Sequence, residues 1–112
     1  MQIEVKGRNV PVNDELRELV ERKFRKVAAQ VSDLSRMEVE LREERNPSIA
    51  DSQVAEVTLY LKGITLRAEG ASRDMPHAVR ICSEELSRQV KRHRDKRRKR
   101  REARAQPPQP AM

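Results

Sequence analysis

The apolar residues of this 112-residue chain switch between two spacings, and this switching constrains the fold more than any other feature of the sequence. Apolar residues at every second position predict a β-strand with one buried face, and apolar residues at every third or fourth position predict an amphipathic helix. The strand spacing occurs over residues 2–8, 37–41, 55–61 and 64–68, and the helix spacing occurs over residues 13–30 and from residue 74 onward. The predicted order of elements is therefore β-α-β-β-β-α.

Turn signals separate the predicted strands. Asn46-Pro47-Ser48 marks a loop, and Lys62-Gly63 predicts a tight hairpin between the last two strands. The strand residues predicted to point inward are Ile3, Val5, Met37, Val39, Leu41, Ala55, Val57, Leu59, Leu61, Ile64, Leu66 and Ala68. Those predicted to point outward on the last two strands are Val54, Glu56, Thr58, Tyr60, Thr65, Arg67 and Glu69.

Each predicted helix begins at a residue type that caps helices well. Asn13 precedes the first helix, and Asp74 precedes the second, in which Pro76 is tolerated because it lies in the first turn. The apolar face of the first helix consists of Leu16, Leu19, Val20, Phe24, Val27 and Val31. That of the second consists of Met75, Ala78, Val79, Cys82, Leu86 and Val90.

These faces predict an α+β fold in which a four-stranded sheet carries two helices packed on one face. That arrangement buries both helical stripes and the inward sides of the strands in a single core. The last three strands can be joined by short connections, whereas the first strand must reach the sheet across the first helix.

Charge is distributed unevenly along the chain. Residues 88–104 hold eleven of the 25 Lys and Arg residues and only two of the 18 acids, so this segment has a net charge of +9. The remaining fourteen bases are outnumbered by sixteen acids, which gives the rest of the chain a net charge of −2. A concentrated basic segment joined to an amphipathic helix predicts contact with a polyanion, and nucleic acid is favoured over a merely solvated tail.

The second helix is predicted to project beyond the core. The apolar stripe stops at Val90, but helix-forming residues continue through KRHRDKRRKRREARA. A helical segment over residues 91–101 would reach about 15 Å, although like-charge repulsion is expected to fray it in free solution. Residues 106–112, with three prolines, are predicted to be disordered.

Several function classes are excluded by composition. No apolar run approaches the length of a membrane span, and the N-terminus has no signal-peptide pattern, so a cytoplasmic protein without membrane attachment is expected. Cys82, on the apolar helix face, is expected to be a buried thiol rather than a nucleophile. His77 and His93 lack the further ligands that a metal site needs. We expect no catalytic site, no cofactor and no small-molecule substrate.

Three segments carry a resemblance to a known family. They are the opening IEVKGRNVPVNDELRELVERKFRKV, the strand pair EVTLYLKGITLRAEG and the run ASRDMPHAVRICSEELSRQVKRHRDK. Over residues 1–95 the chain resembles the hibernation-promoting factor / ribosome-associated translation inhibitor family, in its short form. The resemblance implies a layout similar to that of double-stranded-RNA-binding domains. It divides the chain into a ribosome-binding α/β domain, residues 1–95, and a basic C-terminal extension, residues 96–112.

The same resemblance implies a function and a set of contacts. Family members bind the small ribosomal subunit through 16S rRNA, occupy mRNA and tRNA positions and inhibit translation under stress or in stationary phase. We expect a monomer when the protein is free. The residues implied to contact rRNA are Arg22, Lys23, Lys26, Arg88, Lys91, Arg92, Arg94, Lys96, Arg97 and Arg98.

The chain departs from the family pattern at two places. Arg80 stands where the family usually has an acid, and Pro76-His77 replaces a helix start that commonly contains an aromatic residue. Long members pair two ribosomes through a second domain, which this sequence does not include. Among short members, some promote ribosome dimers and others carry an extra tail that obstructs mRNA, and the KRRKRR extension favours the second behaviour.

Two other functions remain open from the residues alone. The chain could be a general module for double-stranded RNA or other nucleic acid that acts off the ribosome, or a protein-interaction module such as a regulator of a transcription factor. A protein partner would not require eleven bases in seventeen positions. RNA-recognition-motif chemistry is disfavoured because Phe24 and Tyr60 are the only aromatic residues, and Phe24 lies on the core stripe. The outer sheet face, with Glu38, Glu40, Glu56 and Glu69, is predicted to repel RNA. The helices and the basic segment are therefore expected to approach RNA, helped by Lys6 and Arg8 at the strand edge.

Overall fold

The computed structural model describes residues 1–31, 35–46 and 48–105, with side chains as far as Arg100. Its elements are β1 (Gln2–Arg8), α1 (Asp14–Ala28), β2 (Arg36–Glu43), β3 (Gln53–Leu61), β4 (Ile64–Ser72) and α2 (Met75–Ala105). The predicted order β-α-β-β-β-α is confirmed. The prolines predicted to lie in a disordered end, and Pro47 of the predicted loop, lie outside the described residues.

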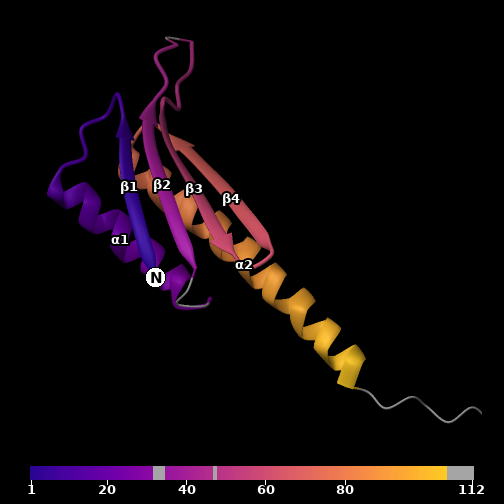
Figure 1. Cartoon of the computed structure of the whole chain (residues 1–112). Helices are drawn as coiled ribbons and strands as arrows, with labels where there is room; N and C mark the ends of the chain where they lie inside the picture. The colour runs from indigo at the N-terminus through magenta and orange to yellow at the C-terminus, as the bar shows by residue number, and fades with distance from the viewer. Residues whose placement is uncertain (32–34, 47, 106–112) are drawn as a thin grey trace, which may run out of the picture.

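The four strands form one sheet in the order β1-β2-β3-β4 (Figure 1). β1 pairs in parallel with β2, with Val5 opposite Val39, because α1 carries the chain back between them. The β2–β3 and β3–β4 pairs are antiparallel. Gly63 adopts a positive φ of 81° in the two-residue turn between β3 and β4, a conformation that glycine adopts without strain, and the predicted hairpin is confirmed.

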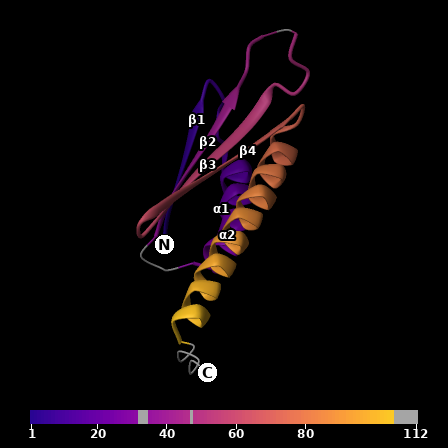
Figure 2. The ribbon, with the colours of Figure 1, turned by 90° about the vertical axis from the view of Figure 1, so that its right-hand side faces the viewer.

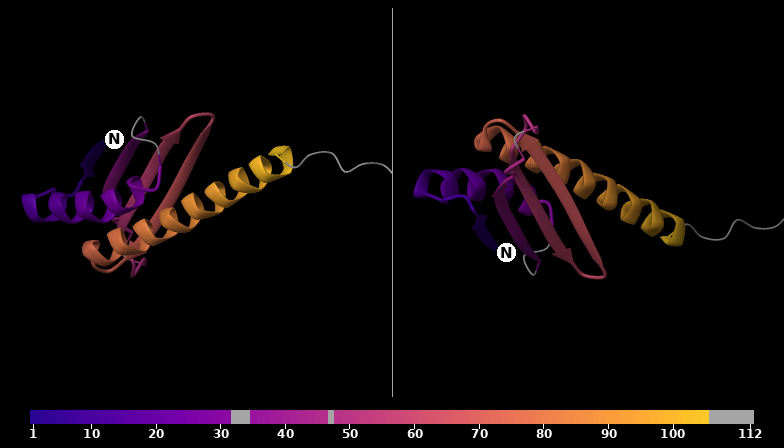
Figure 3. Two further views of the ribbon diagram at one scale, coloured as in Figure 1. Left: turned by 90° about the horizontal axis from the view of Figure 1, so that it is seen from below. Right: turned by 90° about the horizontal axis from the view of Figure 1, so that it is seen from above.

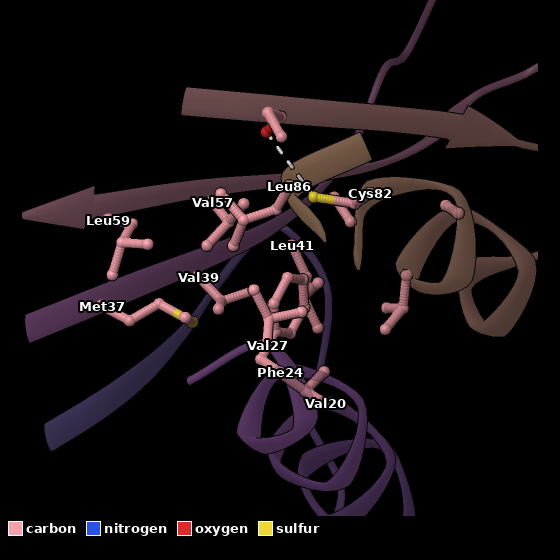
Figure 4. Close-up of a cluster of buried hydrophobic side chains, with 14 of the residues drawn as sticks. Val20, Phe24, Val27, Met37, Val39, Leu41, Val57, Leu59, Cys82 and Leu86 are labelled. Carbon is pink, nitrogen blue, oxygen red and sulfur yellow. Dashed lines mark hydrogen bonds between the residues drawn. The ribbon is translucent and has the colours of Figure 1, made fainter. Parts of the chain in front are cut away.

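Both helices lie on the same face of the sheet, as predicted (Figure 2). The core between the layers contains the predicted apolar stripes, and Phe24, Met37, Leu41, Leu59 and Leu86 are fully buried in it (Figure 4). Ile3 and Val5 are only half-buried, because β1 is an edge strand with one neighbour. The core therefore fixes α1 and α2 side by side on the sheet.

Each helix begins where the sequence predicted. The Asn13 side chain accepts a hydrogen bond from the Leu16 backbone N–H at 2.8 Å, which confirms it as the N-cap of α1. The Asp74 carbonyl accepts the first bond of α2, from the Ala78 N–H at 3.0 Å. A methyl group added to Gly70 of β4 would collide with the backbone of α2 at Ala78, so glycine at this position allows strand and helix to approach closely.

The end of α1 differs from the prediction. We expected the helix to run to residue 30, but it ends at Ala28 with Ala29 as its C-cap. The Gln30 N–H bonds to the Val27 carbonyl at 3.0 Å, and the Val31 N–H bonds to the Ala28 carbonyl at 3.2 Å. These three-residue steps tighten the last turn and end the regular helix early.

Two outward-facing residues are unexpectedly buried. Val54 is 3% exposed and Thr58 is 9% exposed, although both alternate onto the outer side of β3. Each lies in a strand with neighbours on both sides. Arg42 pairs across from Val54, and Arg67 pairs across from Thr58. We attribute the burial to long side chains on the flanking strands, which can cover small residues on the central strand.

The second helix continues far past the core. α2 has 31 residues and is therefore about 46 Å long. The residues of its predicted apolar face are buried as far as Val90, which is 1% exposed, and the helix then extends beyond the end of the sheet (Figure 3). We call residues 91–105 the arm. Helix continues without a break across the predicted domain boundary between residues 95 and 96.

Candidate nucleic-acid interface

The three predicted cations of α1 share one side of that helix. Arg22 and Lys26 are four residues apart and exposed, and Lys23, three residues before Lys26, is half-buried. Phe24 and Val27 point into the core on the opposite side. α1 therefore presents a small cationic surface to solvent on the outer side of the helix layer.

The seven predicted cations of α2 do not form a single surface. All seven are exposed, and they are Arg88, Lys91, Arg92, Arg94, Lys96, Arg97 and Arg98. At 100° per residue, they are distributed around the whole helix. Arg94 lines a hollow beside Gln30 and Val31, near the end of α1, whereas Lys96 lines a groove beside the β3–β4 turn. The described cations of the arm therefore face several directions, some toward the sheet or the end of α1 and others toward solvent.

One predicted cation is held in an ion pair within its own helix. A nitrogen of the Arg88 guanidinium lies 2.8 Å from a carboxylate oxygen of Glu85, and the two side chains are 69% and 38% exposed. Exposed pairs of this kind contribute little to stability, so an RNA phosphate can compete with Glu85 for Arg88 at low energetic cost.

The outer face of the sheet has a different electrostatic character. Arg42 lies within 3.1 Å of carboxylate oxygens of Glu44 and Glu56 and within 3.2 Å of one of Glu69. Partial burial lowers the pKa of this guanidinium, but the hydrogen bonds to Glu44 and Glu56 and the charge of Glu69 outweigh that effect and raise it above its ordinary value. The network keeps Arg42 occupied by carboxylates, which removes it from the residues that could attract a phosphate.

A second polar cluster occupies the same face. Arg36 stacks over the Tyr60 ring with 4.4 Å between the guanidinium carbon and the ring centroid, and the Tyr60 hydroxyl donates a hydrogen bond to Glu38 at 3.2 Å. Tyr60 lies on the open face, as predicted, but its ring is covered by Arg36. This ring is therefore not available as a stacking platform for a base in the observed arrangement.

Cys82 and His77 lie in different surroundings. Cys82 is fully buried, and burial followed by the charge of Glu69 raises the pKa of its thiol to about 12, which confirms a packed thiol. His77 is exposed and shares a 2.9 Å hydrogen bond between its Nδ1 and the Ser72 hydroxyl. Within residues 1–31, 35–46 and 48–105, no cluster of three or more His, Cys, Asp or Glu side chains could hold a metal ion. Over the same ranges no helix is both long and apolar enough to cross a membrane.

Sequence reasoning missed a groove between the arm and the sheet. Its volume is about 620 Å³, and it lies between the β3–β4 turn and the underside of α2, which is the side of the helix that faces the sheet. Lys62 and Arg100, which were not among the predicted contacts, line it together with Lys96 and Arg97. One signal was available: Arg97 follows Val90 by seven residues, so it continues the buried stripe of the helix on the same side.

The fold and the charged surfaces together define a class of protein: a small α+β domain with a cationic helical projection, suited to binding a polyanion. The chain belongs to the family described as Sigma 54 modulation protein / S30EA ribosomal protein, whose model matches residues 3–98. The family that the sequence resemblance predicted is thereby confirmed.

Curated relatives match over most of this chain. It is 32% identical over 96 residues to the ribosome hibernation promoting factor of Salmonella typhimurium and 30% identical over 96 residues to that of Escherichia coli, covering 86% of this chain and 96% of each relative. It is 27% identical over 97 residues to the ribosome hibernation promotion factor of a Picosynechococcus species. The chain spans about half the length of that Picosynechococcus relative.

Solved structures share the fold. A ribosomal subunit interface protein from Coxiella burnetii superposes with a TM-score of 0.73 at 21% identity, covering 85% of this chain and 99% of that one. The N-terminal domain of Protein Y from Thermus thermophilus superposes with a TM-score of 0.71 at 26% identity, covering 83% of this chain and 99% of that one. The predicted α+β fold is thus shared by both of these solved proteins.

Proposed function

We propose that this chain is a ribosome hibernation factor that binds the small ribosomal subunit through 16S rRNA and inhibits translation under stress or in stationary phase. The family membership and the similarity to the ribosome hibernation promoting factors of Salmonella typhimurium and Escherichia coli support this proposal. The observation that carries it is the set of exposed basic side chains on the second half of α1 and on the arm of α2, while carboxylates engage Arg36 and Arg42 on the sheet.

The proposed inhibition requires occupancy and no chemical step. Basic side chains on both helices bind rRNA phosphates and release counterions, and the bound protein fills the space that mRNA and tRNA need. The chain acts in the cytoplasm as a non-enzymatic monomer without a cofactor. The residues proposed to contact rRNA are Arg22, Lys23, Lys26, Arg88, Lys91, Arg92, Arg94, Lys96, Arg97 and Arg98.

The proposed division of labour follows the predicted boundary. Residues 1–95 form the ribosome-binding body, and residues 96–112 form a basic extension that adds electrostatic affinity. Because α2 continues from the body into the extension as one helix, docking of the body sets the direction in which the extension leaves. A continuous helical connection of this kind would place the extension along a defined path on the RNA.

Two measurements test this proposal. Sucrose-gradient fractionation of nutrient-limited cells at low salt should place the chain with small subunits or whole ribosomes. Purified protein added in excess over ribosomes should stop in vitro translation, and the Lys91→Ala/Arg92→Ala/Arg94→Ala variant should require a higher concentration to do so. Absence from every ribosomal fraction, together with undisturbed translation, would refute the proposal.

A second candidate is a general double-stranded-RNA module that acts off the ribosome. It is favoured by the distribution of cations around the whole arm, since phosphate contacts carry no sequence information. Competition distinguishes the two functions. Unrelated duplex RNA at equal phosphate concentration should displace the chain from small subunits only if the second candidate is correct.

A further inference from the structure

We propose that the β3–β4 turn and the underside of α2 form a binding groove for a single strand of RNA, distinct from the outer helix surfaces. This inference rests on the proposed function only for the choice of RNA as the polyanion. The groove is the 620 Å³ hollow beneath the arm, and residues from two distant parts of the chain build it.

The groove exists because α2 is longer than the sheet that it covers. The side of α2 that faces the sheet carries Leu86 and Val90, which are buried, and then His93, Arg97 and Arg100 at the following three- and four-residue steps. The sheet ends at the β3–β4 turn. The same side of α2 therefore packs on the core as far as Val90 and lines an open groove beyond it.

The other side of the groove is formed by the β3–β4 turn and the first residue of β4. Lys62, Gly63 and Ile64 line it, and Ile64 is 38% exposed although its position in β4 predicted an inward-facing core residue. Ile64 lies at the end of the sheet, beyond the part of α2 that supplies apolar partners. An exposed isoleucine beside a lysine offers an apolar surface for a ribose or a base and a cation for a phosphate.

The charges in this groove have one sign. Lys62, Lys96, Arg97 and Arg100 line it with His93, and no carboxylate is among the described residues that line it. A concave surface lined by one sign of charge focuses the electrostatic potential and attracts the opposite charge. By contrast, two cations of the outer sheet face, Arg36 and Arg42, each lie within 4 Å of a glutamate.

The size of the groove favours a single strand over a duplex. A volume of about 620 Å³ lies in the range of sites that hold one ligand of ordinary small-molecule size. Duplex RNA is bound instead across wide surfaces that span about 16 base pairs. The lining contains no Phe, Tyr or Trp among its described residues, so recognition depends on the backbone and tolerates any sequence.

A matched pair of charge reversals tests the groove. Lys62→Glu reverses the charge in the β3–β4 turn, and Arg67→Glu reverses a charge on β4 outside the groove. Both side chains are exposed, so both variants should fold. Affinities for a short oligouridylate and for a duplex of about 16 base pairs are measured by fluorescence anisotropy. Lys62→Glu should weaken oligouridylate binding by about tenfold, while Arg67→Glu weakens it by less than about twofold. The two variants should have similar affinities for the duplex.

A crosslinking experiment gives an independent readout. Cys82 is fully buried, so a thiol-specific photocrosslinker should label the Lys62→Cys and Arg67→Cys variants selectively at the new position. Oligouridylate should crosslink at position 62 and not at position 67. Equal crosslinking at both positions, equal loss of affinity in both charge-reversal variants, or undetectable oligouridylate binding by the unmodified chain would each overturn the groove. A chain that shows the position-62 effects yet never associates with ribosomes would refute the proposed function and leave the groove standing.

Discussion

The two halves of α2 are one continuous helix held by different forces. In the first half, Val79, Cys82 and Leu86 are fully buried against the sheet and α1. In the arm, the same helical side carries His93, Arg97 and Arg100, and the described side chains other than His93 are exposed. The first half owes its stability to apolar burial, whereas the arm depends on helix propensity and on continuation of a helix already nucleated.

This contrast separates folding from binding within a single element. The buried half contributes the packing that orients the helix, and the arm contributes the charge that meets a polyanion. A residue can therefore matter greatly for one property and hardly at all for the other. Four experiments test how complete this separation is.

Hydrogen exchange should show the largest difference between the two halves. Amides of residues 79–90 should open only through global unfolding, whereas amides of residues 94–100 should open by local fraying. We expect protection in the first half to be at least about a thousandfold greater, given the usual stability of small domains. Exchange measured by NMR checks this, and equal protection in both halves would show that the arm packs against something.

Core truncation should affect stability far more than loss of an arm charge. Leu86→Ala removes a fully buried side chain and should lower the free energy of unfolding by about 3 kcal/mol. Lys99→Ala, on the exposed arm, should change it by less than about 0.5 kcal/mol. Urea denaturation followed by circular dichroism measures both, and similar losses would contradict the proposed separation.

Loss of arm charges should change the salt dependence of RNA binding without changing stability. For duplex RNA, the Lys91→Ala/Arg94→Ala variant should reduce the slope of log K against log salt by about two units, because two phosphate contacts disappear. The Arg67→Ala/Arg73→Ala variant removes the same charge from exposed positions outside both helices and serves as the control. An unchanged slope in the arm variant, or an equal reduction in the control, would rule out a special role for the arm.

Salt should stabilise the helical arm slightly in the free protein. Like charges four residues apart, such as Arg92 with Lys96 and Lys96 with Arg100, each disfavour helix by about 0.2–0.5 kcal/mol when unscreened. Raising the ionic strength from about 0.1 M to about 1 M shortens the screening length from about 10 Å to about 3 Å and should increase helicity modestly. Circular dichroism at about 222 nm, where helices absorb, should record the rise in helicity. Amide exchange near Leu86, measured by NMR, should not change with salt.

The sequence predicted the elements well and their ends less well. Alternation located all four strands, and Asn13 located the start of α1 by a capping interaction that the structure contains. The end of α1 was missed by two residues because the tightened bonds at Gln30 and Val31 leave no signal in residue type. Burial of Val54 was missed because it depends on the long residues of neighbouring strands, whose register the sequence pattern alone does not give.

The candidate site shows the same division. The ten predicted cations are exposed, except for half-buried Lys23. Charged side chains outside the apolar stripes are rarely buried unless they are paired. Lys62 was not predicted to contact RNA, because a single lysine in a turn is typical of any solvent-exposed surface. Only the fold places it opposite Arg97, which is 35 positions later in the chain.

By itself, the sequence determined which segments become strands and helices, which of their sides are apolar and where positive charge concentrates, because these properties depend on residues close together in the chain. The tertiary structure alone decided where the sheet stops relative to α2, and hence that His93 and Arg97 roof a groove instead of joining the core. That outcome depends on how the layers pack and how far each element extends, which no local pattern encodes.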